Sequence, residues 1–206
     1  MENRKTEQHP LGFDLPPNTK LLMLGSFPPP RERWSMNFYY PNFQNDMWRI
    51  LGLVFYADKD YFVAAPGKAF DEKKARLFCR EKGIALGDTA MEVIRLKDNA
   101  SDKFLEVVTP FTPEEVLDKI PACEAFVITG QKAMDTLRSV VSFDAPKTGS
   151  FAPCLIGGRM IRVYRMPSSS RAYPKPLQEK AKDYKKMFEE LGLLSIYFFT
   201  FVLLNI

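Results

Sequence analysis

A short, wholly apolar run that stops at a glycine is the feature that most limits the folds open to this chain. Leu21–Leu24 is followed by Gly25, Ser26, Phe27 and three prolines at 28–30. A run of this length and composition is typical of a strand buried on both faces, as in a parallel sheet. A glycine and a proline-stiffened turn directly after such a strand bring backbone N–H groups to the carboxyl edge of the sheet, where α/β proteins bind ligands.

Aromatic and carboxamide side chains gather a little further along. Phe38–Tyr40 supplies three rings in a row, and Asn42, Gln44 and Asn45 supply carboxamides before Trp48. Flat rings offer a stacking surface, and carboxamides both donate and accept hydrogen bonds. This combination indicates a site for a planar heterocycle such as a nucleobase.

Strand-like and helix-like segments alternate along the rest of the chain. Apolar runs predict buried strands at Ile84–Leu86 and Ala125–Thr129, and Gly157-Gly158 predicts a hairpin between Cys154–Ile156 and Met160–Tyr164. Helical spacing and capping signals predict helices or helical turns at 46–55, 71–82, 89–96, 112–120, 133–140 and 176–191. This alternation predicts an α/β fold whose parallel sheet is covered on both faces by helices.

The bulk composition fits a single domain. A chain of 206 residues with 46% apolar content is large enough for one well-buried core. We expect that domain to span 18–192, after a loose polar arm at 1–17 that lacks the apolar core of a secretory signal. Cys79, Cys123 and Cys154 lie far apart without metal-ligand spacing, so they predict buried, reduced cysteines of a cytoplasmic protein.

Positive charge is concentrated near the C-terminus. The net charge is only +4, yet nine Lys or Arg lie between Arg159 and Lys186 against Glu179 and Asp183. A basic segment on a mildly acidic body indicates an anionic partner bound at one face. A solvated, lysine-rich helix over Lys180–Lys186 is the alternative.

The final segment, 193–206, carries no charged residue and is rich in Phe, Leu and Ile. It is shorter than the roughly 20 residues that a membrane-spanning helix needs, so no stable membrane association is expected. Packing on the body, self-association and a membrane anchor stay open as roles for it.

Five short motifs give the chain a family resemblance. In order along the chain they are Leu24–Pro28, Phe38–Tyr40 with Gln44-Asn45 and Trp48, Ile84–Asp88, Thr129–Ala133 and Met166–Arg171. In these motifs the chain resembles the uracil-DNA glycosylase superfamily, and within it the branch that includes hypoxanthine-DNA (deoxyinosine) glycosylases. The resemblance covers Leu21–Leu191.

The resemblance implies a three-layer α/β/α sandwich with a four-stranded, mainly parallel central sheet and a site at the carboxyl ends of the strands. Members of the family flip a damaged nucleotide out of DNA and hydrolyse its N-glycosidic bond without a metal or cofactor. The implied activity is that of a monofunctional glycosylase in base-excision repair. Its partner is DNA containing a deaminated base, with hypoxanthine favoured over uracil.

The resemblance also bears on the attacking water. Many uracil-removing relatives carry Asn or Asp at the place of Phe27, whose ring cannot hold a water. In the hypoxanthine branch the implied replacement is the asparagine before the helix tryptophan, here Asn45, which orients water rather than deprotonating it. The alternative makes Asn45 the N-cap of the helix that starts at Asp46. Relatives often have His-Pro where this chain has Asn42-Phe43, which makes Asn42 a rival for the water or the base.

The same motifs imply a base pocket. The residues expected to contact the base are Gly25, Ser26, Phe27, Tyr40, Asp88, Asn99 and Ser101. Tyr40 aligns with the ring that stacks on the flipped base, with a core aromatic as the alternative. Asp88 is expected to accept from a purine N–H or to fix a neighbouring loop, unless it caps a helix. The last two residues of the set lie, together with Asp102, in a polar loop that resembles one near the hypoxanthine pocket.

A serine-rich turn is expected to contact the DNA backbone. Ser168, Ser169 and Ser170 are small enough for close approach and offer hydroxyl and N–H groups to phosphates, although an ordinary serine turn is the alternative. Arg171 is expected to fill the gap left in the base stack or to bind phosphate. Lys132, at a predicted helix start, is a second candidate phosphate contact. His9, the one histidine, lies in the expected arm, so no catalytic histidine is expected.

Two other classes of function stay open from the sequence. A non-catalytic nucleic-acid-binding protein of the same fold predicts salt-sensitive DNA binding without release of a base. An α/β enzyme that acts on free nucleotides or nucleosides predicts a closed pocket and no dependence on the basic segment.

Overall fold

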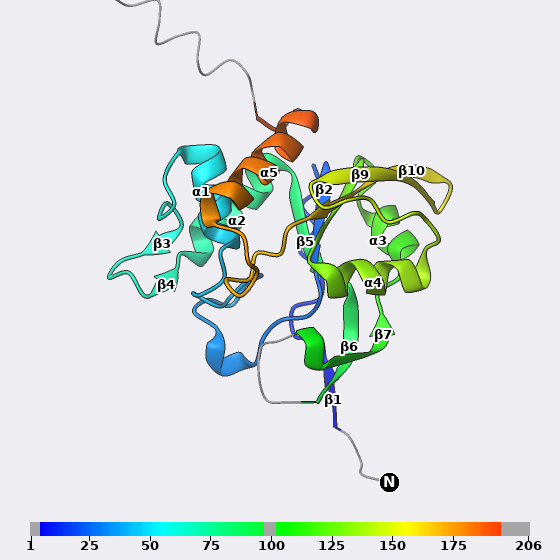
Figure 1. The fold of residues 1–206 in the computed structure, drawn as a ribbon, viewed down its shortest axis with the longest axis horizontal. Helices are drawn as coiled ribbons and strands as arrows, with labels where there is room; N and C mark the ends of the chain where they lie inside the picture. The colour runs from blue at the N-terminus through cyan, green and yellow to red at the C-terminus, as the bar shows by residue number, and fades with distance from the viewer. Residues whose placement is uncertain (1–4, 97–101, 195–206) are drawn as a thin grey trace, which may run out of the picture.

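A five-stranded mixed sheet lies at the centre of the computed structural model, which describes residues 5–96 and 102–194 (Figure 1). In spatial order its strands are β5 (Ile84–Asp88), β2 (Leu21–Gly25), β8 (Ala125–Thr129), β10 (Arg159–Met166) and β9 (Ser150–Ile156). The first four run parallel, whereas β9 pairs antiparallel with β10 at the edge. The expectation of a four-stranded sheet is corrected, because the hairpin at Gly157-Gly158 adds a fifth strand to the four parallel ones.

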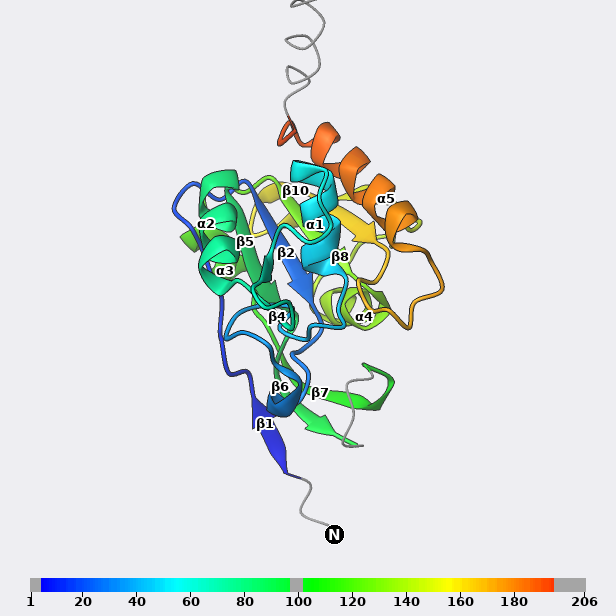
Figure 2. The ribbon, with the colours of Figure 1, turned by 90° about the vertical axis from the view of Figure 1, so that its left-hand side faces the viewer.

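Helices cover both faces of this sheet. One face carries α1 (Met47–Tyr56), α2 (Glu72–Lys82) and α5 (Leu177–Glu190), and the other carries α3 (Pro113–Lys119) and α4 (Gln131–Val140) (Figures 1 and 2). Alternate residues of β2 point to opposite faces of the sheet. Leu21 and Met23 belong to the core cluster on the first face, and Leu22 and Leu24 belong to the cluster on the second. The chain is therefore an α/β protein with three layers.

Local signals place the helix ends close to the predicted positions. The Asp71 side chain accepts a hydrogen bond from the backbone N–H of Lys74 at 3.0 Å, and α2 ends at Gly83, whose φ is +65°. α1 starts at Met47 and α5 at Leu177, each one residue later than predicted. Thr112 precedes α3 as its N-cap residue.

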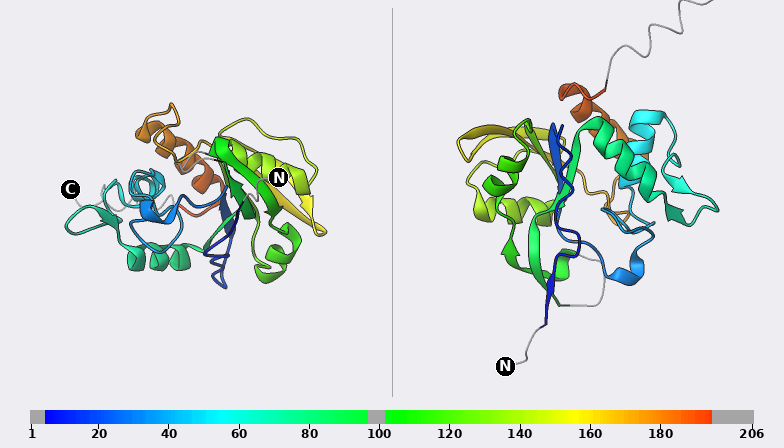
Figure 3. Two further views of the ribbon diagram at one scale, coloured as in Figure 1. Left: turned by 90° about the horizontal axis from the view of Figure 1, so that it is seen from below. Right: turned by 180° about the vertical axis from the view of Figure 1, so that it is seen from behind.

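The described part of the N-terminal segment is not a loose arm. β1 (Thr6–Gln8) pairs antiparallel with β6 (Ala90–Arg95), which pairs in turn with β7 (Leu105–Pro110). Asp14 then exchanges backbone hydrogen bonds with Leu86 of β5. The expectation was wrong because the partners of this segment are strands far away in the sequence, and Figure 3 shows the segment running along the body.

The prediction of a helical turn at 89–96 is also wrong, because this stretch forms β6. Its buried positions, Ala90 and Val93, pack with Phe27 and Leu105 in a small third core cluster. Tertiary packing thus decides the conformation of a stretch whose own periodicity is ambiguous. The remaining described elements are β3 (Val63–Ala64), β4 (Ala69–Phe70) and two 3-10 turns, η1 (Arg31–Arg33) and η2 (Asp102–Phe104).

The C-terminal region is described only as far as residue 194. Leu193 and Leu194 pack against the core cluster that contains α5, while 195–206 lie outside the described residues. None of the described helices combines the length and the apolar character needed to cross a membrane. The three cysteines are buried and free of disulfides, as predicted.

Candidate active site

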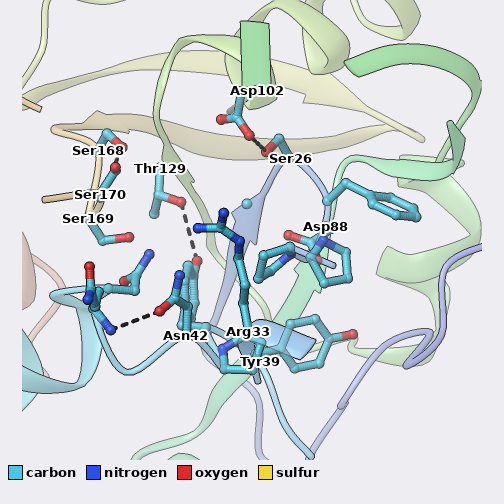
Figure 4. Close-up of a pocket in the computed structure, with 18 of the residues that line it drawn as sticks. Ser26, Arg33, Tyr39, Asn42, Asp88, Asp102, Thr129, Ser168, Ser169 and Ser170 are labelled. Atoms are coloured by element: carbon cyan, nitrogen blue, oxygen red, sulfur yellow. Dashed lines mark hydrogen bonds between the residues drawn. The ribbon is translucent and has the colours of Figure 1, made fainter. Parts of the chain in front are cut away.

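A cavity of about 600 Å³ lies at the carboxyl ends of β2, β5 and β8 (Figure 4). It brings together most of the predicted site residues: Gly25, Ser26, Phe27, Tyr40, Asn42, Asn45, Asp88, Ser168, Ser169, Ser170 and Arg171 all line it. Lys132 does not line it, and Asn99 and Ser101 lie outside the described residues. The predicted residues therefore converge on one space although they come from distant parts of the chain.

Tyr40, which lines the cavity, has an unusual backbone conformation. Its φ is +50°, in the left-handed region that bulky residues rarely adopt. The hydroxyl lies 3.3 Å from Oγ1 of Thr129, and Thr129 Oγ1 donates its own proton to the carbonyl of Leu24 at 3.2 Å, so Tyr40 is the donor of the pair. Burial raises the pKa of Tyr40 well above its ordinary value, which keeps the phenol neutral. Strain of this kind concentrates at functional sites.

Gly25 is required by the close approach of two cavity residues. A Cβ atom built on Gly25 would lie 2.4 Å from Oδ1 of Asp88 and 3.8 Å from a ring carbon of Tyr40. The first distance is shorter than any tolerated contact, so a side chain at this position would displace the carboxylate. The glycine of the first motif thus makes room for the end of β5.

Both candidate water-holding amides are fixed by backbone hydrogen bonds. Asn45 Oδ1 accepts from the N–H of Met47 at 2.8 Å, and Asn42 Oδ1 accepts from the N–H of Gln44 at 2.9 Å. The N-cap residue of α1 is Asp46 rather than Asn45, but the Asn45 side chain still satisfies an N–H of the first turn. The helix-end role and the cavity role therefore coexist in Asn45. The second lone pair of each amide oxygen and each NH₂ group are the atoms that a water could meet.

The serine turn, defined as Ser168–Arg171, is anchored to the start of α1. The backbone N–H of Asp46 donates to the carbonyl of Ser169 at 2.8 Å. Lys180 of α5 is 1% exposed in its side chain, and its Nζ donates to Asp46 Oδ2 at 3.0 Å and to the carbonyl of Ser170 at 2.7 Å. Arg171 Nε donates to the other oxygen of Asp46 at 3.2 Å, with its side chain 47% exposed. The turn is therefore held rigidly beside Asn45.

A histidine for which the sequence predicts no catalytic role lies directly behind the cavity. His9 Nε2 is 2.8 Å from Oδ2 of Asp88, and both side chains are nearly inaccessible. Asp88 lines the cavity and His9 does not. Burial raises the pKa of Asp88, and the hydrogen bond from His9 opposes that rise. No local motif marks His9, because its partner lies 79 residues away in the sequence.

A second carboxylate lies inside the same cavity. Asp102 Oδ1 accepts from the hydroxyl of Ser26 at 2.8 Å, and burial raises the pKa of Asp102. The hydrogen bond from Ser26 opposes that rise in pKa, as do the positive charges of Lys132 and Arg95. Cationic side chains also line the cavity, at Arg33, Lys103 and Arg171. Figure 4 shows Arg33 extending between Asn42 and Asp88.

The basic C-terminal segment does not form a free basic face. Each of its nine cations has a partner in the structure. Five of them are paired with carboxylates on or near α5, namely Lys175, Lys180, Lys182, Lys185 and Lys186. The guanidinium of Arg159 instead donates to backbone carbonyls in the last turn of α3 and after it, including that of Cys123 at 2.6 Å. The charge excess along the sequence is thus largely compensated in space.

Within the described part of the chain, no group of three or more His, Cys, Asp or Glu side chains is placed to hold a metal ion. The groups that the cavity offers to a ligand are carboxylates, carboxamides, hydroxyls, guanidinium groups and aromatic rings.

Comparison with known proteins bears on the fold. No family model matches the chain, and no curated protein matches it in sequence. Among solved structures, the solution NMR structure of a protein from Methanosarcina acetivorans, described as a "putative Uracil DNA glycosylase", superposes with a TM-score of 0.61 at 20% sequence identity. The match covers 91% of this chain and 99% of the other. The two chains share one fold. This agrees, at the level of architecture, with the resemblance drawn from the five motifs.

Proposed function

We propose that this protein is a DNA glycosylase that hydrolyses the N-glycosidic bond of a deaminated base flipped out of DNA, as the first step of base-excision repair. Hypoxanthine is the favoured base and uracil the second. The proposal rests on one observation above all: Tyr40, Asn42, Asn45 and the serine turn line a single cavity at the carboxyl edge of the sheet.

The cavity offers each interaction that excision of a flipped base needs. Tyr40 supplies a ring for stacking, and Asp88 supplies a hydrogen-bond acceptor for an N–H of the base edge. Asn45, with Asn42 as its rival, orients the water that attacks the sugar carbon. Because the bond breaks towards a cationic sugar and an anionic base, catalysis depends on fixed dipoles and positioned water more than on a strong base.

The serine turn and the cations that line the cavity supply the contacts to DNA. The hydroxyls of Ser168 and Ser170 accept hydrogen bonds from the backbone N–H groups of Ser170 and Ala172, respectively, which fixes the shape of the turn. Small, fixed residues allow phosphates on either side of the flipped nucleotide to approach. Arg171 and Arg33 add positive charge beside them.

Phe27 supports hypoxanthine over uracil. Its ring packs edge-on against His9 with centroids 5.3 Å apart, so it is committed to packing and offers no polar atom to a water. In this proposal the water is therefore held by Asn45 or Asn42, as in the hypoxanthine branch that the motifs resemble.

The test uses purified protein and end-labelled duplexes that contain hypoxanthine, uracil or xanthine at one position. Abasic product from the hypoxanthine duplex, formed faster than from the uracil duplex, is expected. Tight DNA binding without abasic product from any duplex would contradict the enzymatic proposal and favour a non-catalytic DNA-binding protein. Inhibition by free deoxyinosine as strong as that by the hypoxanthine duplex would instead favour an enzyme of free nucleosides.

Substitution of Asn45 tests the water-orienting role. Asn45→Ala should lower the single-turnover rate by about 100-fold or more, the usual effect of removing one fixed polar group from a catalytic site. Because Asn45 also satisfies Met47 N–H, the variant should lose about 1 kcal/mol of stability. Asn45→Asp keeps an oxygen acceptor for that N–H and serves as the matched control for folding. An unchanged rate in Asn45→Ala would move the role to Asn42.

A further inference from the structure

The His9–Asp88 pair is a buried hydrogen-bonded unit that none of the steps above explains. His9, which does not itself line the cavity, contacts Asp88 from the segment that follows β1. The imidazole packs against two cavity residues, Phe27 at 5.3 Å and Tyr39 at 6.2 Å between ring centroids. Tyr39 also donates its hydroxyl proton to the carbonyl of Gly12, in the same segment as His9. The ring of His9 is thus held in one position.

The protonation pattern of His9 follows from its backbone contacts. Nδ1 accepts from the N–H of Gly12 at 3.0 Å and from the N–H of Leu11 at 3.3 Å. A nitrogen that accepts two N–H groups carries no proton of its own, so we assign the proton of the neutral ring to Nε2. Nε2 therefore donates to Asp88 Oδ2, 2.8 Å away, and Asp88 is the acceptor.

The other carboxylate oxygen is the one left for a ligand. No described residue donates to Oδ1 of Asp88. This oxygen lies beside Gly25, within 2.4 Å of where a side chain at that position would begin. With Oδ2 engaged by His9, Oδ1 beside the cavity-lining Gly25 is the carboxylate oxygen left to accept a hydrogen bond from a ligand.

We propose that His9 is a positioning residue that sets the hydrogen-bonding polarity of the cavity: its fixed Nε2–H holds Asp88 so that the cavity presents an acceptor. This inference rests on the proposed function, because the matching ligand is a base that offers an N–H donor on its edge. Hypoxanthine has such a group at N1, whereas adenine has an acceptor there. The pair thus gives a physical reason to reject adenine, the undamaged parent of hypoxanthine.

Replacement of Asp88 by Asn tests this idea, because it should change the group that faces the cavity from an acceptor to a donor. In the variant, the Nε2–H of His9 can be accepted only by the oxygen of the new carboxamide, so its NH₂ group would face the cavity. Asp88→Asn should therefore lower the rate of hypoxanthine release by about 100-fold, as expected for a lost charge-assisted hydrogen bond replaced by two opposed donors. Adenine release should not fall with it.

A double variant removes the imidazole N–H that fixes the orientation of residue 88. In the double variant His9→Leu/Asp88→Asn the amide is free to rotate and present its oxygen, so hypoxanthine release should recover by about 10-fold relative to Asp88→Asn alone. His9→Leu on its own should slow the reaction, and His9→Gln, whose amide NH₂ can take the place of Nε2–H, should restore it. A merely structural role for His9 predicts the opposite, namely a double variant slower than either single one. Thermal unfolding of all four variants shows which of them are folded.

A readout that does not depend on activity completes the experiment. His9 is the only histidine in the chain, so ¹⁵N-histidine labelling gives one imidazole to observe by NMR. The proton is expected on Nε2 in the wild type at neutral pH. A proton on Nδ1, or a double variant no faster than Asp88→Asn while the wild type is active, would overturn the inference. If the wild type releases no base from any duplex, the proposed function fails, and the NMR spectrum alone decides the state of the pair.

Discussion

Asp88 is a buried carboxylate of the cavity through which pH can act on the site. Burial raises its pKa above that of an exposed aspartate, while the hydrogen bond from His9 opposes the rise. The groups that surround it are His9, Tyr39 and Tyr40, with Asp102 also within electrostatic range. Because only the ionised carboxylate is an acceptor on both oxygens, release of hypoxanthine should fall as the pH drops through the pKa of Asp88 in the folded protein.

A pH–rate profile under single-turnover conditions checks this prediction. His9→Leu removes the group that opposes the rise, so its acidic limb should lie at higher pH than that of the wild type, and His9→Gln should bring it back. Stability depends on pH in the opposite direction from the rate. A carboxyl group whose pKa is raised by folding lowers the free energy of unfolding only when the pH exceeds the pKa of that group in the unfolded chain. The contribution of Asp88 to the free energy of unfolding is therefore fully present at low pH and is lost as the pH rises through the raised pKa of the folded protein. Coincident profiles for all three proteins would contradict the assignment.

The site residues that could be predicted from the sequence are those that belong to short, contiguous motifs. Gly25, Tyr40 and Asn45 belong to short contiguous motifs, and the structure places all three in the cavity wall. His9 owes its place to a contact with Asp88, which lies 79 residues away in the sequence. Asp102 belongs to the polar loop that resembles one near the hypoxanthine pocket, but its hydrogen-bond partner, Ser26, lies 76 residues away. A pairing of that kind leaves no pattern in one sequence, because only the folded chain brings the partners together.

The helix α5 is joined to the site through a single buried lysine. Lys180 joins the start of α1 to the serine turn by way of Asp46 and the carbonyl of Ser170. Lys180→Met should lower the free energy of unfolding by about 3 kcal/mol, because it leaves Asp46 buried with only the half-exposed Arg171 as a partner. Urea unfolding measures the loss.

The matched control for this variant is Lys185→Met, on the same helix but 56% exposed in its side chain, where a change within about 0.5 kcal/mol is expected. The double variant Asp46→Asn/Lys180→Met should regain stability relative to Lys180→Met, because no uncompensated charge then stays buried. Equal losses in Lys180→Met and Lys185→Met would show that the buried pair does not hold the turn.

Elements with their own start and stop signals were predictable, and elements that exist only through pairing were not. α2 has an Asp cap and a terminal glycine, and its predicted and observed ends agree. By contrast, β1 is three residues long and the sequence of β6 predicts a helical turn, yet the two stabilise each other in an antiparallel pair. Short strands carry too few residues for periodicity to distinguish them from turns, so their state is set by the rest of the fold.

Over the whole molecule, charge counted along the sequence differs from charge available to a partner. Lysines 185 and 186 of α5 are paired with Glu189 and Glu190, one helical turn further along. The cations that line the cavity are Arg33, Lys103 and Arg171, which come from three separate segments. The DNA backbone should therefore be held around the cavity mouth rather than along α5.

Salt dependence of DNA binding distinguishes these two surfaces. Each phosphate contact that is removed should lower the magnitude of the slope of log K against log salt concentration by about 1. Arg33→Gln and Lys103→Gln should each weaken binding to an undamaged duplex and reduce the slope by that amount, whereas Lys185→Gln and Lys186→Gln, which remove the same charge, should change neither. Fluorescence anisotropy titrations over a series of salt concentrations measure both quantities. If the α5 variants weaken binding as much as the cavity-lining variants do, the DNA lies along the lysine-rich helix, and the cavity-centred arrangement proposed for excision loses its electrostatic support.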